Sequence, residues 1–268
     1  MPDLIMDEYY PTPPYLPLIS VCIATYNGSA YLAAQLDSVL NQTHSNIEML
    51  IGDDGSTDGT REILEKYARR DGRIRLIFNL ENLGYNRNFE ALAYKASGEY
   101  IAFCDQDDVW AQDKLERLLA AIGERDVAYG SSVLIDAKGQ PLGDTLLDKL
   151  ALMPVQGKEQ HPLLRANTVS GHAMLCRGDF VRRCLPFETR KPLQLYDYYL
   201  AVCATLQNGL VYCPDAITYH RLHGSNSQNT QPKKQRKPGW FWQRWWQRRH
   251  KARLVHEVLN QVRQRNKK

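Results

Sequence analysis

Short apolar runs alternate with longer stretches of helical periodicity over the first 124 residues of the chain. Each run predicts a strand and each periodic stretch predicts the helix that follows it. The predicted strands are 18–24, 47–52, 74–78 and 100–104, and the predicted helices are 31–40, 60–67, 88–96 and 113–122. Alternation of this kind is typical of a mostly parallel central sheet flanked by helices, so the sequence predicts an α/β fold.

The pattern is less regular beyond residue 125. Short strands are predicted near 127–135 and 209–213, and a helix near 197–207. The chain therefore divides into a proline-rich extended segment, one domain with two halves, and a tail that follows a polar hinge. The predicted boundaries are 1–17 for the extended segment, 18–124 and 125–232 for the halves of the domain, and 233–268 for the tail.

Polar residues follow three of the predicted strands directly. The clusters are Thr25-Tyr26-Asn27, Asp53-Asp54-Gly55-Ser56 and Asp105-Gln106-Asp107-Asp108. Ligands of such sheets bind beyond the carboxyl ends of the strands, where these clusters meet. The third cluster holds three carboxylates within four residues, and their mutual repulsion is relieved when a hard cation such as Mg²⁺ or Mn²⁺ binds their oxygens.

The first two clusters suggest a nucleobase pocket. A carboxylate such as Asp54 can accept the imide N–H of uracil or thymine, and the ring of Tyr26 can lie against the base. Asn27 can bond ribose or backbone. Helix capping equally explains residues 56–60, and a Tyr followed by Asn-Gly is also a common turn.

Five segments in a fixed order resemble family 2 glycosyltransferases of the GT-A fold. They are 23–32, 38–43, 53–60, 82–84 and 105–107, and the resemblance extends over roughly residues 18–226. The stretch Phe103–Trp110 resembles the branch that includes bacterial rhamnosyltransferases building surface polysaccharides. The resemblance implies a GT-A-like fold in which residues 18–124 bind a nucleotide sugar and residues 125–232 bind the acceptor.

The activity implied by this resemblance is inverting, metal-dependent transfer of a sugar, rhamnose or a hexose, from a UDP- or dTDP-sugar. The acceptor would be a hydroxyl of a growing cell-surface glycan of lipopolysaccharide, O-antigen or capsule type. A nucleotidyltransferase is a less favoured alternative, because residues 25–31 contain no Lys or Arg for a basic phosphate loop. A non-catalytic module that binds a nucleotide sugar or a membrane also remains an alternative.

Carried over position by position, the resemblance also implies individual roles on the donor side. Thr25, Tyr26, Asn27, Asp54 and Gln106 would surround the nucleotide. The ion, Mn²⁺ or Mg²⁺, would be bound by Asp107, while Asp105 would serve the ribose or a metal-bound water. For Asp108, which the resemblance does not assign, we expect capping of the helix after Trp110 or ordering of the loop, and a catalytic role is the alternative.

The remaining implied roles fall on more distant positions. Arg221 would reach the diphosphate, and Arg87 would reach phosphate or ribose. His223 would complete the metal site, which suits Mn²⁺ better than Mg²⁺. Asp197 would take the proton of the acceptor hydroxyl as general base, although it can also cap its helix. Gly171-His172 occupies the place of a loop beneath the donor sugar and acceptor.

The net charge of +4 is unevenly distributed. Residues 233–268 hold thirteen Lys or Arg and one acid, whereas residues 1–232 hold twenty-one bases and twenty-nine acids. The tail also has tryptophans at one end and an apolar stripe, which predicts an amphipathic helix that binds an anionic membrane surface through residues 240–265. The stripe can instead dock on the body or on a second subunit. No nucleic-acid partner is expected.

The cysteines and the absence of long apolar runs bear on location. The six cysteines include no Cys-x-x-Cys pair and lie in apolar surroundings, so they predict reduced core residues. Neither a signal peptide nor a spanning helix is predicted. We therefore expect a cytoplasmic protein, peripheral on the inner face of the cytoplasmic membrane, where an acceptor of this family can be lipid-linked.

Overall fold

The computed structural model describes residues 15–160, 162–163, 166–189 and 193–224, together with residues 257, 260 and 264. The elements up to the middle of the chain are β1 (Ile19–Thr25), α1 (Leu32–Leu40), β2 (Ile47–Asp53), α2 (Thr60–Ala68), β3 (Ile74–Phe78), α3 (Tyr85–Lys95), β4 (Tyr100–Asp105), β5 (Val109–Trp110) and α4 (Lys114–Ile122). The later ones are β6 (Val127–Ile135), β7 (Pro141–Thr145), α5 (Leu146–Leu150), η1 (Gly171–Ala173), β8 (Met174–Arg177), α7 (Gly178–Cys184), α8 (Tyr196–Thr205) and β9 (Leu210–Arg221).

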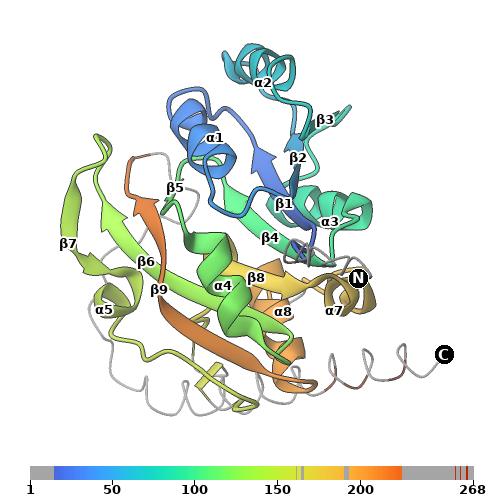
Figure 1. The fold of residues 1–268 in the computed structure, drawn as a ribbon, viewed down its shortest axis with the longest axis vertical. Coiled ribbons are helices and arrows are strands. Elements are labelled where there is room, and N and C mark those ends of the chain that lie inside the picture. The colour runs from blue at the N-terminus through green and yellow to red at the C-terminus, as the bar shows by residue number, and fades with distance from the viewer. Residues whose placement is uncertain are drawn as a thin grey trace, which may run out of the picture.

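The strands form one nine-stranded sheet with the order β3-β2-β1-β4-β8-β6-β9-β5, and β7 pairs with β6 (Figure 1). Strands β3, β2, β1 and β4 are parallel, whereas β8 is antiparallel to both β4 and β6. The register aligns Thr25 with Asp53 and Ala24 with Asp105. The three polar clusters predicted from the sequence therefore lie level with one another at one edge of the sheet.

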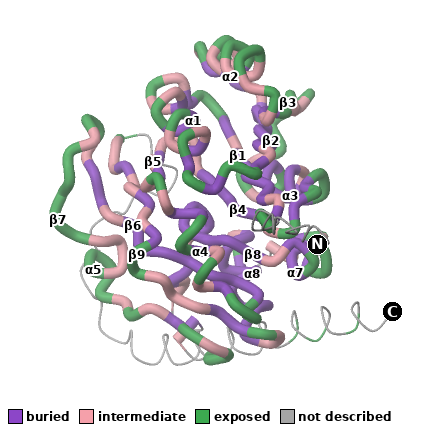
Figure 2. The backbone as a smooth tube through the Cα atoms, viewed as in Figure 1, coloured by how far each residue is buried: buried purple, intermediate pink, exposed green. Residues whose placement is uncertain are grey.

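Alternate residues of the central strands supply two hydrophobic cores. Ile19, Val21 and Ile23 of β1 pack with α1, α2 and α4, while Cys22 packs on the other side with α3, α7 and α8. A strand buried on both faces needs a continuous apolar run, which is the pattern seen in the sequence. The buried residues accordingly concentrate in the strands between the helices (Figure 2), and the predicted α/β fold is confirmed.

The second half departs further from the predicted elements. Strand β9 continues eight residues past the predicted end at 213, although Pro214 and Asp215 interrupt its apolar pattern. The structure accommodates them at a register shift opposite Gly130, where an added Cβ would collide with the carbonyl of Ala216. The interruption is thus an irregularity within one strand, and the continuation carries His220 and Arg221 toward the carboxyl edge of β4.

Several predictions concern residues outside the described part of the chain. Most of the predicted amphipathic tail helix and most of the proline-rich N-terminal segment lie there. All six cysteines lie within the described residues, are free, and with one exception are buried, as predicted. Among the described helices, none combines the length and apolar character needed to cross a membrane.

Candidate active site

The loop after β4 is held against the end of β9. Strand β5 pairs with β9 through Val109 opposite Tyr219 and Trp110 opposite Thr218. This pairing brings Asp108 beneath the following residues of β9: its Oδ1 accepts the backbone N–H of Arg221 at 3.1 Å and lies 2.9 Å from Nδ1 of His220. Asp108 therefore orders the loop, one of the two roles predicted for it, whereas Asp113 occupies the N-cap of α4.

Asp107 faces His223 across the same loop. Its Oδ2 lies 2.9 Å from Nε2 of His223, whose ring packs on Tyr31 with centroids 4.7 Å apart. Burial raises the pKa of the Asp107 carboxyl, and the charges of Asp108 and Asp105 raise it further. A carboxylate oxygen beside an imidazole nitrogen is a donor set that Mn²⁺ accepts, so these two residues fit the implied metal ion.

Asp197 opens helix α8 at a buried position. Its Oδ2 accepts the backbone N–H of Gly171 at 3.0 Å, and its Oδ1 accepts Nδ2 of Asn167 at 3.1 Å. Burial raises the pKa of Asp197 to about 6, although the hydrogen bonds from Gly171 and Tyr198 oppose that rise. A carboxylate with a pKa near neutrality is suited to accept a proton.

The single turn η1 connects Asp197 with the acids after β4. Gly171 binds Asp197, and the next residue, His172, places Nδ1 3.3 Å from Oδ2 of Asp105 and 3.4 Å from Oδ2 of Asp108. A side chain at position 171 would collide with Oη of Tyr196, so glycine is required for this approach. Two adjacent residues thus join the carboxylate of α8 to those of the loop after β4.

His172, His220 and Asp108 form a compact buried group. The two imidazole rings stack with centroids 4.7 Å apart and an interplanar angle of 11°. Burial opposes a charge on His220, yet the neighbouring Asp108 raises the pKa of His220 to about 9. Burial also opposes a charge on Asp108, yet the two histidines lower the pKa of Asp108. The sequence placed His172 near the sugars and did not associate it with Asp108.

Lys114 lies under this group, and sequence reasoning missed it. Burial lowers the pKa of its ammonium to about 7. Its Nζ donates to the backbone oxygen of His172 at 2.6 Å and lies 3.5 Å from the ring centroid of Trp110. Lys114 lies in the first turn of the amphipathic helix α4, next to Leu115. Nothing in the neighbouring sequence indicates that Lys114 is buried, because its partner oxygen is 58 residues away along the chain.

The acid and the amide predicted to border a nucleotide, Asp54 and Asn27, bind neighbouring loops. The Asp54 carboxylate accepts Nδ2 of Asn79 at 3.0 Å and the backbone N–H groups of Leu83 and Gly84, each at 2.8 Å. Asn27 accepts the N–H of Thr57 at 2.8 Å. Both side chains therefore fix the shape of the loops that border the predicted base pocket.

The other predicted donor-side residues differ in exposure. Tyr26 is 50% exposed, while Thr25 beside it is buried. Gln106 exchanges two hydrogen bonds with the backbone of Tyr26, at 2.8 and 3.0 Å, which ties the loop after β4 to the loop after β1. Arg87 projects outward, with its side chain 73% exposed beside Glu90.

Arg221 is buried and turned inward. Its Nε donates to the carbonyl of Asp107 at 3.0 Å, and its guanidinium lies 4.8 Å from the ring centroid of Tyr31. Further bonds to the carbonyls of Asp136 and Ala137 are each 3.3 Å. In this structure Arg221 supports the loop that carries Asp107.

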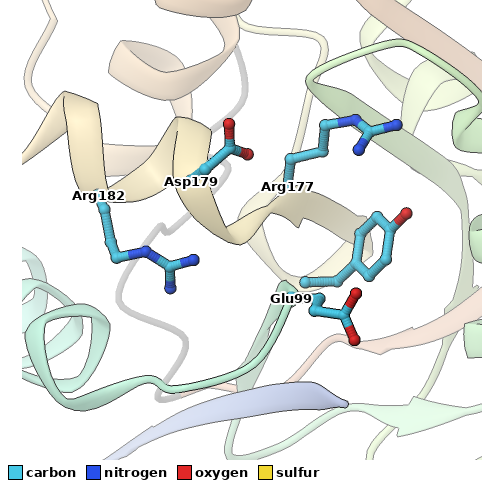
Figure 3. A pocket seen from close by; sticks show the side chains of 5 residues that line it. Glu99, Arg177, Asp179 and Arg182 are labelled. Atoms are coloured by element: carbon cyan, nitrogen blue, oxygen red, sulfur yellow. The ribbon is translucent and has the colours of Figure 1, made fainter. Parts of the chain in front are cut away.

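A separate pocket of about 230 Å³ lies at the opposite edge of the sheet (Figure 3). It is lined by Glu99, Tyr100, Arg177, Asp179 and Arg182. Glu99 and Tyr100 are at the start of β4, whereas Asp105 is at its end. None of the residues predicted to act on a substrate lines this pocket.

Comparison with known proteins adds a family assignment to this geometry. Residues 20–183 match the model described as glycosyl transferase family 2. TuaG of Bacillus subtilis, a glycosyltransferase assigned to teichuronic acid biosynthesis, is 41% identical over 128 residues, which are 47% of this chain and 51% of TuaG. WfgD of Escherichia coli, a UDP-Glc:alpha-D-GlcNAc-diphosphoundecaprenol beta-1,3-glucosyltransferase, is 36% identical over 135 residues, 49% of each chain. The chain thus spans about half the length of these relatives.

A solved structure supports the GT-A-like fold. The mannosyltransferase PcManGT of Pyrobaculum calidifontis, in complex with GDP-Man and Mn²⁺, superposes with a TM-score of 0.61 at 18% sequence identity. The superposition covers 79% of this chain and 59% of PcManGT. At this identity the likeness concerns the fold.

Proposed function

Because the chain belongs to glycosyl transferase family 2, we propose that it is a metal-dependent, inverting glycosyltransferase. The proposed donor is a UDP- or dTDP-sugar carrying rhamnose or a hexose, and the proposed acceptor is a hydroxyl of a growing cell-surface glycan. The functions that TuaG and WfgD are named for support this class of acceptor. In this proposal residues 18–124 bind the donor and the later half binds the acceptor.

One observation carries the proposal: the short turn η1 contacts a carboxylate on each of its two sides. Gly171 binds the buried Asp197, and His172 lies beside Asp105 in the loop after β4. Inverting transfer needs a base at the acceptor hydroxyl, on the opposite side of the sugar from the leaving diphosphate. Asp197 is assigned as that base, since its carboxylate is fixed by Gly171 and its pKa is about 6. At neutral pH it is largely ionised and can take the proton.

Asp107 and His223 are assigned to hold the divalent ion. When bound there, the ion supplies positive charge that stabilises the leaving diphosphate. Asp105 is assigned to the ribose or to a water beside the ion, and the exposed ring of Tyr26 to the face of the base. Arg87, which extends into solvent next to the donor side, is assigned to phosphate.

Arg221 is assigned to the diphosphate less directly than the sequence predicted. Its guanidinium holds the carbonyl of Asp107, so its proposed contribution is to position the carboxylate that binds the ion. Asp54, Asn27 and Gln106 likewise shape the base pocket through the loop contacts described above. The imide contact proposed for Asp54 would use the remaining acceptor capacity of its oxygens.

Attachment to an anionic membrane through residues 240–265 is part of the proposal. It rests on the charge and the apolar stripe of the tail, which lies outside the described residues. The name of WfgD, which specifies a diphosphoundecaprenol acceptor, supports a lipid-linked acceptor here. The protein would then be cytoplasmic and peripheral on the inner membrane face.

Two measurements test the function. A thermal-shift screen of nucleotide sugars with and without Mn²⁺ should show stabilisation only by the correct donor, because a ligand of the folded state raises the melting temperature. With that donor and a lipid-linked glycan, wild type should release nucleoside diphosphate. Asp197→Asn should retain the thermal shift and lose about 10²- to 10⁴-fold in kcat.

The outcomes separate the alternatives. Normal turnover by Asp197→Asn would refute the assignment of the base. Donor binding without turnover, with all acceptors tried, would favour a binding module. Release of pyrophosphate from a nucleoside triphosphate would favour a nucleotidyltransferase.

A further inference from the structure

Three atoms of kinds that can bind a metal ion converge between η1 and the loop after β4. Nδ1 of His172 lies 3.3 Å from Oδ2 of Asp105 and 3.4 Å from Oδ2 of Asp108. His172 and Asp108 are 4% and 1% exposed. Within the described part of the chain, Oδ2 of Asp108 is buried and accepts no hydrogen bond. Leaving a buried carboxylate oxygen in that condition is costly, and a cation bound to it would remove the cost.

Ser132 fixes the other side of the His172 ring. Its Oγ lies 2.8 Å from Nε2. When Nε2 donates its hydrogen to Ser132, Nδ1 carries a lone pair that faces two carboxylate oxygens. Such an arrangement is repulsive without a cation among the three atoms, and a hydrogen bond at the second ring nitrogen is the usual support of a metal-binding histidine.

The distances favour a metal ion over a shared proton. Hydrogen bonds between a charged imidazole and a carboxylate are about 2.7–2.9 Å long, shorter than both separations at Nδ1. Around a tetrahedral ion whose ligand atoms are about 2.0–2.2 Å away, neighbouring ligand atoms are about 3.3–3.6 Å apart, a range that includes both separations at Nδ1. The separations therefore match the edge of a tetrahedral site.

His220 supplies a third ligand from β9. One ligand atom each of Asp108, His172 and His220 lie within 4.8 Å of one another. The stacked His220 ring is held by Oδ1 of Asp108, which leaves Oδ2 directed at His172. Two imidazoles and a carboxylate form a ligand set typical of Zn²⁺ and similar transition metals rather than of Mg²⁺ or Ca²⁺.

We propose that Asp108, His172 and His220 form a second metal site, which binds Zn²⁺ and ties η1 and the end of β9 to the loop after β4. Asp105 borders this site through Oδ2. The site uses neither Asp107 nor His223, which the proposed function assigns to the ion at the donor phosphates. It therefore goes beyond that function, and zinc can be measured without donor, acceptor or turnover.

Metal content of the untagged full chain tests the proposal. After loading with Zn²⁺ and extensive dialysis, elemental analysis should find about one zinc ion per chain in wild type, as expected for one site with three protein ligands. Asp108→Asn and His220→Gln should lose that ion. Asp107→Asn and His223→Gln should retain it. Replacement by Co²⁺ should give the intense visible absorption of a tetrahedral site in wild type and not in His220→Gln.

Two variants guard against misfolding and nonspecific loss. Ser132→Ala leaves every ligand in place and should weaken zinc affinity about 10- to 100-fold, as expected for loss of a hydrogen bond that orients a ligand. His44→Gln is the matched control, because His44 is also a buried histidine but lies against the carbonyl of Pro17. It should bind zinc as wild type does.

Three results would overturn the proposal. Wild type could leave dialysis without zinc. Zinc could be lost in Asp107→Asn or His223→Gln while His220→Gln keeps it, which would assign it to the donor site. Equal zinc in all variants would assign it to unrelated surface ligands.

Discussion

Two regions of the molecule are rich in acids and amides: the loops after β1 and β2, and the loop after β4. The two regions differ in the partners of these side chains. After β1 and β2, Asp54 accepts three hydrogen bonds from residues 79–84, and Asn27 binds the loop before α2. After β4, Asp105, Asp107 and Asp108 face histidines from η1 and the end of β9.

The difference teaches how to separate supporting carboxylates from reactive ones. An acid saturated by N–H donors stabilises a loop, whereas the charge of an acid that faces other acids depends on the imidazoles or cations beside it. Similar Asp-rich sequences thus give one hydrogen-bonded rim and one region in which carboxylates and imidazoles lie close together. Substitutions should have opposite consequences in the two regions.

The largest expected effect is on stability. Asp54→Ala leaves three donors without an acceptor, so it should lower the free energy of unfolding by about 3 kcal/mol or more. Asp107→Ala should change that energy little, because burial already disfavours its charge, and should abolish stabilisation by donor with Mn²⁺. Urea unfolding and thermal shift measure the two effects. Equal destabilisation by both variants would remove the distinction.

The next effect is the pH dependence of turnover. The folded-state pKa of Asp197 is raised from 3.8 to about 6, so its basic form is present above that pH and is lost as pH falls. The value of kcat should decline about tenfold per pH unit below pH 6, because only the ionised base accepts the proton. Steady-state rates between pH 4.5 and 8, roughly the window around this pKa, test it. Residual activity of Asp197→Asn should lack this decline.

The smallest effect concerns Arg87, the exposed cation at the rim. Arg87→Ala should change the free energy of unfolding by no more than about 0.5 kcal/mol, since its contact with Glu90 is solvent-exposed. The KM for the donor should rise about fivefold, equivalent to about 1 kcal/mol of lost phosphate contact. Arg69→Ala, which alters an exposed pair with Glu65, is the matched control. An unchanged KM in Arg87→Ala would exclude a phosphate role.

The sequence was sufficient for the regular half of the fold. Apolar runs buried on both faces predicted β1 to β4, and their ends predicted where the polar clusters meet. The strand β9 was only half predicted, because Pro214 and Asp215 resemble a turn until the register shift opposite Gly130 is seen.

The hydrogen-bond partners of the side chains were harder to predict than the positions of the residues. The partners of Asp54 lie 25 to 30 residues away, and His172 meets Asp105 across 67 residues. No local pattern encodes such contacts. The functions of Asp105, Asp107, His223 and Asp197 remain predictions, although the structure brings these residues to the same edge. The functions of the residues predicted to bind the donor also remain predictions, although the structure shows how their side chains are oriented.

The antiparallel strand β8 also determines how the molecule can open. It bonds to β4 on one side and to β6 on the other, so it joins the parallel strands of the first half to the strands of the second half in one sheet. Rotating one half against the other would cost these hydrogen bonds, so we expect the loops to move more readily than the halves. Under the proposed function, substrate entry and product release would therefore use displacement of loops at the carboxyl ends of the strands, while the sheet itself stays unchanged.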